Sequence, residues 1–123
     1  AALAPAYASG DVGASGRAYR RWALENPTQF LVMFGRAVPD VVPGDAALER
    51  GYESFLRLVR HVHAIRPDLS EGDAFDWAYH VNATVHGYVL TEITGMSTAP
   101  DRAEELYKLG LRRLLRPLVG ERA

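Results

Sequence analysis

The stretch from Ser70 to Met96, SEGDAFDWAYHVNATVHGYVLTEITGM, most constrains what this chain can fold into. It contains no proline, and its serine is followed three residues later by Asp73, which is typical of a capping box at a helix start. Gly95 can take the left-handed conformation that ends a helix. We therefore predict a helix of about 24 residues, roughly 36 Å long. In a chain of 123 residues, a helix of this length must be the central element.

Two largely apolar stripes run along this predicted helix. The first follows alternating spacings of four and three residues, and it comprises Phe75, Tyr79, Asn82, His86, Val89 and Ile93. The second lies beside it and comprises Ala74, Ala78, Val81, Val85 and Tyr88. Because little of the helix is suited to water, we expect it to be buried on two sides, in the chain's own core and against a second surface.

The composition fits one globular domain. With 123 residues, of which 48% are hydrophobic, the chain can bury about two-thirds of its unfolded surface. It has no cysteine, which excludes disulfides and thiolate metal sites and is compatible with the cytoplasmic location that we expect. The net charge of −1 gives no electrostatic reason to expect nucleic-acid binding, and no apolar run is long enough to span a bilayer.

We predict further helices before and after the central one, and no strand, so the fold class is all-α. Their approximate ranges are 15–25, 27–37, 45–65 and 100–118, with Asn26 as a cap before Pro27 and with Pro117 ending the last helix. Residues 10–16 are predicted to form a loop. Residues 1–14 are interpreted as a flexible lead-in or the end of a linker helix, and residues 15–123 as the domain. In the first helix, Arg20 is assigned to the solvated face.

The candidate chemistry centres on Asn82 and His86, two polar residues one turn apart on an otherwise apolar stripe. A buried polar group without a partner costs about 1–3 kcal/mol. Either these residues hydrogen-bond within the core or across a helix contact, or they are the few polar groups of an apolar small-molecule pocket. The histidine spacings and the absence of an HExxH motif lead us to predict no metal and no cofactor.

Two segments together resemble a known family. The sequence YRRWALENPTQFLVMFGRAVP at 19–39 resembles the Y-x-x-(W/F)-A-x-x-(N/H)-P-x-x-(F/Y)-x-x-M-F segment in the regulatory domains of tetracycline-repressor-like (TetR) transcriptional regulators. Trp77 and HGYVLTEITGM at 86–96 resemble the H-G-x-x-x-x-E-x-x-G segment of the subgroup named for its Trp, His and Gly. That subgroup often has tryptophan where this chain has Asn82.

The resemblance implies a five-to-six-helix ligand-binding and dimerisation domain, which pairs with a second copy through a four-helix bundle formed by the last two helices. It also implies that operator DNA is bound only by an N-terminal helix-turn-helix domain that these 123 residues do not include. We therefore expect a homodimeric repressor's regulatory half, not an enzyme, with no membrane contact. A small apolar or aromatic effector would release the full-length protein from its operator.

These expectations translate into two residue sets. The expected ligand-binding residues are Trp22, Phe30, Met33, Phe34, Tyr52, Phe55, Val59, Trp77, Asn82 and His86. The expected dimer-interface residues are Thr84, Gly87, Tyr88, Thr91, Tyr107, Leu111, Leu114 and Leu118. Two alternatives stay open: a small helical-bundle enzyme or cofactor-binding protein that uses Asn82 and His86, or a pure dimerisation module in which the aromatic rings simply fill the core.

Overall fold

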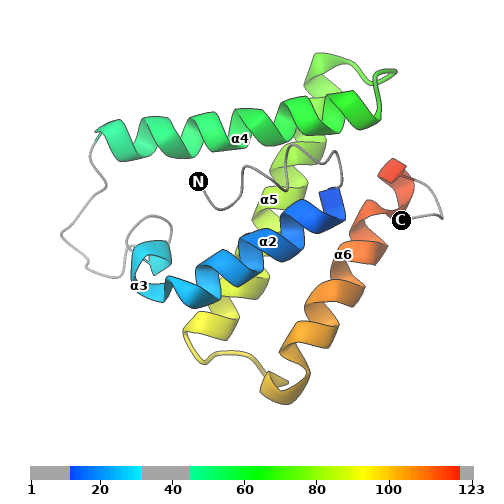
Figure 1. Ribbon diagram of the computed structural model, residues 1–123. Coiled ribbons are helices and arrows are strands. Elements are labelled where there is room, and N and C mark those ends of the chain that lie inside the picture. Colours follow the sequence, from blue (N-terminus) through cyan, green and yellow to red (C-terminus); the bar gives the residue numbers. More distant parts are fainter. Residues whose placement is uncertain (1–11, 32–44, 120–123) are drawn as a thin grey trace.

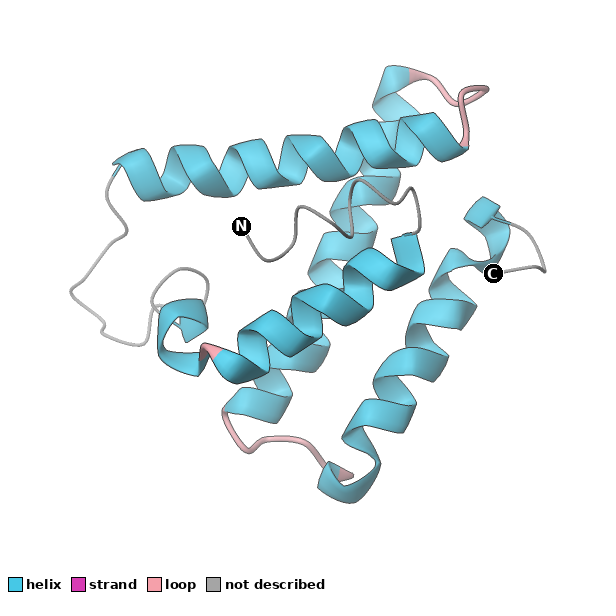
Figure 2. Cartoon of the chain, in the orientation of Figure 1, coloured by secondary structure: helices cyan, strands magenta, loops and turns pink. Residues whose placement is uncertain are grey.

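The computed structural model describes residues 12–31 and 45–119, and within these ranges it contains helices and no strand (Figures 1 and 2). The elements in chain order are α2 (Val12–Glu25), α3 (Pro27–Phe30), α4 (Asp45–Ile65), α5 (Glu71–Ile93), the 3₁₀ turn η2 (Pro100–Arg102) and α6 (Ala103–Val119). The predicted all-α class is therefore confirmed. None of the described helices is long and apolar enough to cross a membrane.

Helix α5 is the central element, as predicted. Figure 1 shows it running behind α2, with α4 crossing its first half and α6 beside its second half. The Ser70 hydroxyl oxygen accepts a hydrogen bond from the Asp73 amide at 3.1 Å, which caps the first turn. Gly95 has a φ of 73° directly after the helix, a conformation that favours glycine. Both ends of α5 are thus set by local interactions.

The hydrophobic core lies where α5 meets the other helices. Five residues of α5 are buried: Ala74, Ala78, Val81, Val85 and Val89. The largest fully buried side chains come from α3, α4, α5 and α6. They are Phe30, Val62, Val89, Tyr107 and Leu118. The second predicted stripe of α5 therefore faces the core. Phe75 and Tyr79 of the first stripe are 40% and 64% exposed.

Helix α2 begins earlier than predicted, and one of its glycines, Gly16, is needed for its packing against α6. The predicted loop at 10–16 is wrong from Val12 onward, where the chain is helical. Gly16 lies so close to α6 that an added Cβ would come within 2.7 Å of Leu111 Cδ1. The Tyr107 hydroxyl also donates a hydrogen bond to the Gly16 carbonyl. Tertiary contact with α6 thus outweighs the poor helix propensity of glycine.

Arg20 is not solvated, contrary to the prediction, but forms an ion pair with Glu92 of α5. Its Nε and Nη2 donate to the two carboxylate oxygens at 3.1 and 2.6 Å, and the side chains are only 15% and 19% exposed. The guanidinium also lies 5.7 Å from the centroid of the Tyr107 ring, within cation–π range. This pair joins α2 to the last turn of α5.

Two predicted helix ends differ in detail from the structure. Asn26 precedes α3, but its side-chain amide donates to the Trp22 carbonyl at 2.9 Å and so closes α2, instead of capping α3. Helix α6 continues through Pro117 to Val119. Arg66, in the turn after α4, donates to the Leu118 carbonyl at 3.1 Å, and this bond satisfies one of the acceptors that a helix end leaves open.

Candidate functional site

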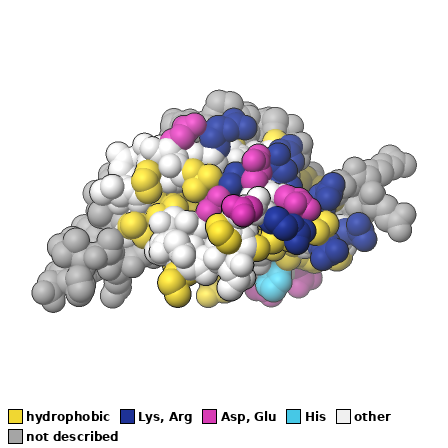
Figure 3. All heavy atoms as spheres, turned by 90° about the horizontal axis from the view of Figure 1, so that it is seen from below, with side chains coloured by type: hydrophobic (Ala, Val, Ile, Leu, Met, Phe, Trp, Pro, Cys, Tyr) yellow, Lys and Arg dark blue, Asp and Glu magenta, His cyan; other side chains and the backbone are white. Residues whose placement is uncertain are grey.

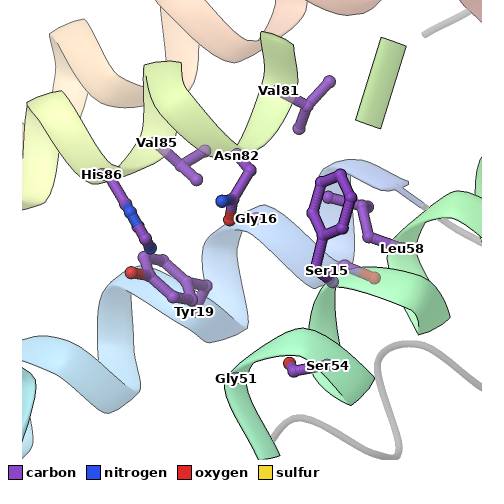
Figure 4. A pocket seen from close by; sticks show the side chains of 11 residues that line it. Ser15, Gly16, Tyr19, Gly51, Ser54, Leu58, Val81, Asn82, Val85 and His86 are labelled. Carbon is purple, nitrogen blue, oxygen red and sulfur yellow. The ribbon is translucent and has the colours of Figure 1, made fainter. Parts of the chain in front are cut away.

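A small cavity lies between α2, α4 and α5, with a volume of about 60 Å³. Its walls mix apolar and small polar side chains (Figure 4). The lining residues are Ser15, Gly16 and Tyr19 from α2, Gly51, Ser54, Phe55 and Leu58 from α4, and Val81, Asn82, Val85 and His86 from α5. The cavity is therefore apolar for most of its surface and has a few hydrogen-bonding groups, which is typical of small-molecule sites.

His86 forms the aromatic end of this cavity. Its ring stacks on Tyr19, with centroids 5.4 Å apart and planes inclined by 28°. The edge of Phe30 meets the same ring at 5.9 Å and 90°. Burial disfavours the charged imidazolium and lowers the pKa of His86 below its ordinary value of 6.5. The imidazole is therefore neutral at pH 7, with one nitrogen that donates and one that accepts.

Asn82 supplies the cavity's amide. Figure 4 shows its side chain pointing from α5 toward α2, near Gly16, with His86 one turn further along α5. Within residues 12–31 and 45–119, no protein group hydrogen-bonds the Asn82 amide or the Ser54 hydroxyl on the opposite wall. Both groups are thus available to a polar atom of a bound molecule.

The structure brings together three of the ten predicted ligand-binding residues in this cavity: Phe55, Asn82 and His86. Phe30 is buried and supports the cavity from behind through its contact with His86. Trp22 is half-buried with its ring centroid 6.5 Å from that of Tyr19, outside the lining.

The remaining predicted ligand-binding residues lie elsewhere. Val59 is half-buried against the core, and Tyr52 is 58% exposed, because it projects from the flank of α4. Trp77 lies on the opposite flank of α5, where it lines a shallow hollow with Leu69 and His80. These three are not cavity residues. Met33 and Phe34 lie outside the described residues.

Several cavity residues escaped the sequence-based reasoning. Ser15 and Gly16 lie where the predicted loop at 10–16 overlaps the predicted helix at 15–25, and neither was predicted to line a site, whereas both lie on the buried side of α2. Gly51 and Ser54 are small residues one turn apart on α4, and they leave space opposite Asn82. Gly51 and Ser54 interrupt a helix face that otherwise carries large apolar residues. This pattern is the signal that could have identified them as cavity residues.

The predicted interface residues divide into two groups. Gly87 and Thr91 are exposed, and Thr84 and Tyr88 are half-buried, so one flank of α5 remains accessible. Three predicted interface residues of α6 are covered within the chain itself: Tyr107, Leu111 and Leu118, which are 1%, 3% and 1% exposed. Leu114 is half-buried and packs on the same core.

Two other leucines of α6 lie outside the core cluster, and one of them, Leu106, adjoins the accessible flank of α5. Leu106 and Leu109 are half-buried, yet neither packs against the core cluster. Leu106 also shares a hollow with Tyr88 and Thr91 of α5, so the two helices form one continuous surface there. The α5 part of this surface carries the small uncharged residues Thr84, Gly87 and Thr91, whereas the hollow also includes Glu92.

The charged side chains do not form a surface of one sign. The view toward the turn between α5 and α6 shows Lys and Arg intermingled with Asp and Glu on one side, and hydrophobic or uncharged side chains on the other (Figure 3). Exposed pairs such as Lys108 with Glu104 and Arg102 with Glu105 account for part of this mixture. Among the described residues, no group of three or more His, Cys, Asp or Glu side chains is arranged to hold a metal ion.

Comparison with known proteins gives one match. The sequence model of the family described as "Tetracyclin repressor-like, C-terminal domain" matches residues 12–114, which span all the helices described here except the end of α6. Comparisons with curated proteins and with solved structures give no significant match.

Proposed function

The chain belongs to the tetracyclin repressor-like C-terminal domain family, and on this premise we propose that it is the effector-binding and dimerisation half of a transcriptional repressor. A small apolar effector enters the cavity between α2, α4 and α5 and changes the arrangement of the dimer. The DNA-reading domains attached to the full-length protein then lose the spacing that fits the operator. The observation that carries this proposal is the cavity itself, in which Asn82 and His86, together with Ser15, Tyr19 and Ser54, supply a few polar groups to a largely apolar wall.

The chemistry of the cavity supports a neutral effector. His86 is uncharged at pH 7 because burial lowers its pKa, and none of the described residues that line the cavity is charged. A bound anion would have no cation to pair with there, and a buried unpaired charge is costly. An amide, hydroxyl or carbonyl group on the effector would find partners in Asn82 and Ser54. The rings of Tyr19, Phe55 and His86 would hold its apolar part.

The size of the cavity implies that a wall moves on binding. A volume of about 60 Å³ is well below the roughly 300–1,000 Å³ of a typical ligand site. Helix α2 is tied to α5 by the Arg20–Glu92 pair and to α6 by the Tyr107–Gly16 hydrogen bond. Helix α4 packs mainly on α5. We therefore expect α4 to be the wall that yields, which couples occupancy to a change of shape.

The test uses alanine substitutions in the complete regulator. Phe55→Ala and His86→Ala should each weaken the inducer response at least several-fold, because each removes a ring from the cavity wall. Trp77→Ala is the matched control, since it removes a half-buried ring from α5 outside the cavity. If Phe55→Ala and His86→Ala fold and respond to inducer with unchanged affinity, the effector does not bind in this cavity.

The second half of the proposal is dimerisation through the accessible flank of α5 and the neighbouring side of α6. Thr84, Gly87 and Thr91 lie on that flank, and Gly87 has no heavy atom within 4 Å of an added Cβ. Leu106 and Leu109 supply apolar area on α6. A second copy packed in the antiparallel sense of a four-helix bundle would cover both helices.

A charge placed on this flank tests the interface without disturbing the core. Gly87→Arg should convert the dimer into a monomer, because the new side chain would lie between closely packed helices. Ala64→Arg introduces the same charge at an exposed position of α4 and serves as control. Light scattering coupled to size exclusion gives the mass directly. A Gly87→Arg protein that remains a dimer would place the interface elsewhere.

A further inference from the structure

Four aromatic residues lie one helical turn apart in two pairs, Tyr52 with Phe55 on α4 and Phe75 with Tyr79 on α5, and we name this group the aromatic shelf. Three of them are exposed to an unusual degree for aromatic residues, with fractions of 58% for Tyr52, 40% for Phe75 and 64% for Tyr79. No other stretch of the described helices has so many exposed rings. Their exposure is not explained by the packing of this chain.

The aromatic shelf is continuous with the cavity. The rings of Phe55 and Phe75 meet edge to face with centroids 5.1 Å apart, which joins α4 to α5. Phe55 is itself a lining residue of the cavity. Tyr52 lies one turn from Phe55 on α4, and Tyr79 lies one turn from both Phe75 and Asn82 on α5. A molecule whose polar end reaches Asn82 would therefore extend over these rings.

The volume of the cavity determines how much of a ligand fits inside it and how much lies on the aromatic shelf. About 60 Å³ accommodates a small polar group, comparable in size to a few water molecules. It is less than half of a cavity that holds benzene, which is about 150 Å³. We expect the movement of α4 to admit the head and at most one ring, so that the rest of a longer planar ligand lies outside the cavity. The shelf offers the apolar area on which that body can lie.

We infer that the effector is elongated and bipartite, with a compact uncharged hydrogen-bonding head in the cavity at Asn82 and a flat apolar body on the aromatic shelf. This inference rests on the proposed effector-binding function and adds the shape of the ligand and a second subsite. Tyr52 and Tyr79 are then specificity-determining residues that select the length of the ligand. Ring contacts are the main attraction on the shelf, because aromatic pairs prefer offset or edge-to-face packing with one another.

The experiment measures the affinity of the complete protein for two probes, phenol and 4-phenylphenol, by titration calorimetry. Both carry the same hydroxyl head on one ring, and only the second ring of 4-phenylphenol would reach Tyr52 and Tyr79. We expect 4-phenylphenol to bind at least tenfold more tightly. Tyr52→Ala and Tyr79→Ala should each lower the affinity for 4-phenylphenol by about 3–10-fold, the loss expected for one aromatic contact. The affinity for phenol should stay unchanged. Asn82→Ala should weaken both probes.

Because both tyrosines are exposed, we expect the Tyr52→Ala and Tyr79→Ala variants to remain folded. Circular dichroism tests whether they do. Equal affinities for the two probes, or tyrosine variants that change neither, would overturn the second subsite and leave the proposed cavity intact. Failure of both probes to bind would overturn the cavity and the shelf together. A Tyr52→Ala or Tyr79→Ala protein with altered mass in solution would assign the shelf to a subunit contact and refute the inference.

Discussion

The ion pair between Arg20 and Glu92 links α2 to α5 across 72 residues of sequence, and its removal should be costly. Arg20→Met removes the guanidinium and retains the apolar stem, so the change isolates the charge. A matched pair exists on the surface. Arg102 donates to Glu105 through the same two nitrogens, at 3.3 and 3.1 Å, but these side chains are 56% and 65% exposed.

The magnitude follows from burial. Breaking a fully buried pair costs about 3–5 kcal/mol, because the remaining charge has no partner, whereas exposed pairs contribute about 0–1 kcal/mol. Arg20 and Glu92 are 15% and 19% exposed, much closer to the buried limit. We therefore expect Arg20→Met to lower the free energy of unfolding by about 2–3 kcal/mol, and Arg102→Met to lower it far less.

The assay is urea unfolding followed by circular dichroism at fixed protein concentration, with a double-mutant cycle for each pair. The coupling energy of Arg20 with Glu92 should be about 1.5–3 kcal/mol and should persist in 1 M salt, because buried pairs are screened less. The coupling energy of the surface pair, Arg102 with Glu105, should vanish in 1 M salt. An Arg20–Glu92 coupling no larger than that of the surface pair would refute the reasoning that burial sets the strength of this contact.

Three further predictions concern packing, protonation and DNA. Gly16→Ala should destabilise the fold by about 1–3 kcal/mol in urea unfolding, because its Cβ would meet Leu111, whereas Gly51→Ala, with open space around it, should stabilise α4 by up to about 1 kcal/mol. Because the pKa of His86 is lowered on folding, the unfolded chain binds a proton first, so stability should be constant above about pH 6.5 and fall below it. His86→Phe should abolish this dependence of stability on pH. If the variant still loses stability below about pH 6.5, the effect belongs to another titratable group. Residues 1–123, with a net charge of −1, should show no salt-sensitive binding of duplex DNA by fluorescence anisotropy, and sub-micromolar binding would contradict this.

The sequence was sufficient to predict α5 and α4, and the reason is that their boundaries depend on neighbours in the chain. Ser70 caps α5 through the amide three residues later, and Gly95 ends it with its own backbone conformation. The bounds of α4, Asp45–Ile65, agree with the predicted helix, because its apolar period is long and uninterrupted. Asn82 and His86, which line the cavity, could be selected as candidates from the sequence because polar side chains on an apolar stripe require partners.

Features that depend on contacts between helices could be decided only by the tertiary structure. Whether Val12 to Gly16 is helix depends on α6, since glycine has poor helix propensity and only the close approach of Leu111 favours it there. The two stripes of α5 are similar in hydrophobicity, so periodicity could not show that one is core and the other flanks the cavity.

The same holds for single side chains. An arginine on an amphipathic helix is solvated by default, and its partner Glu92 lies 72 residues away, at a distance that no local pattern encodes. The sequence by itself thus determined the helices and the polar groups that need explanation. The tertiary structure decided their partners, because a helix's period identifies its faces but not the surface that each face meets.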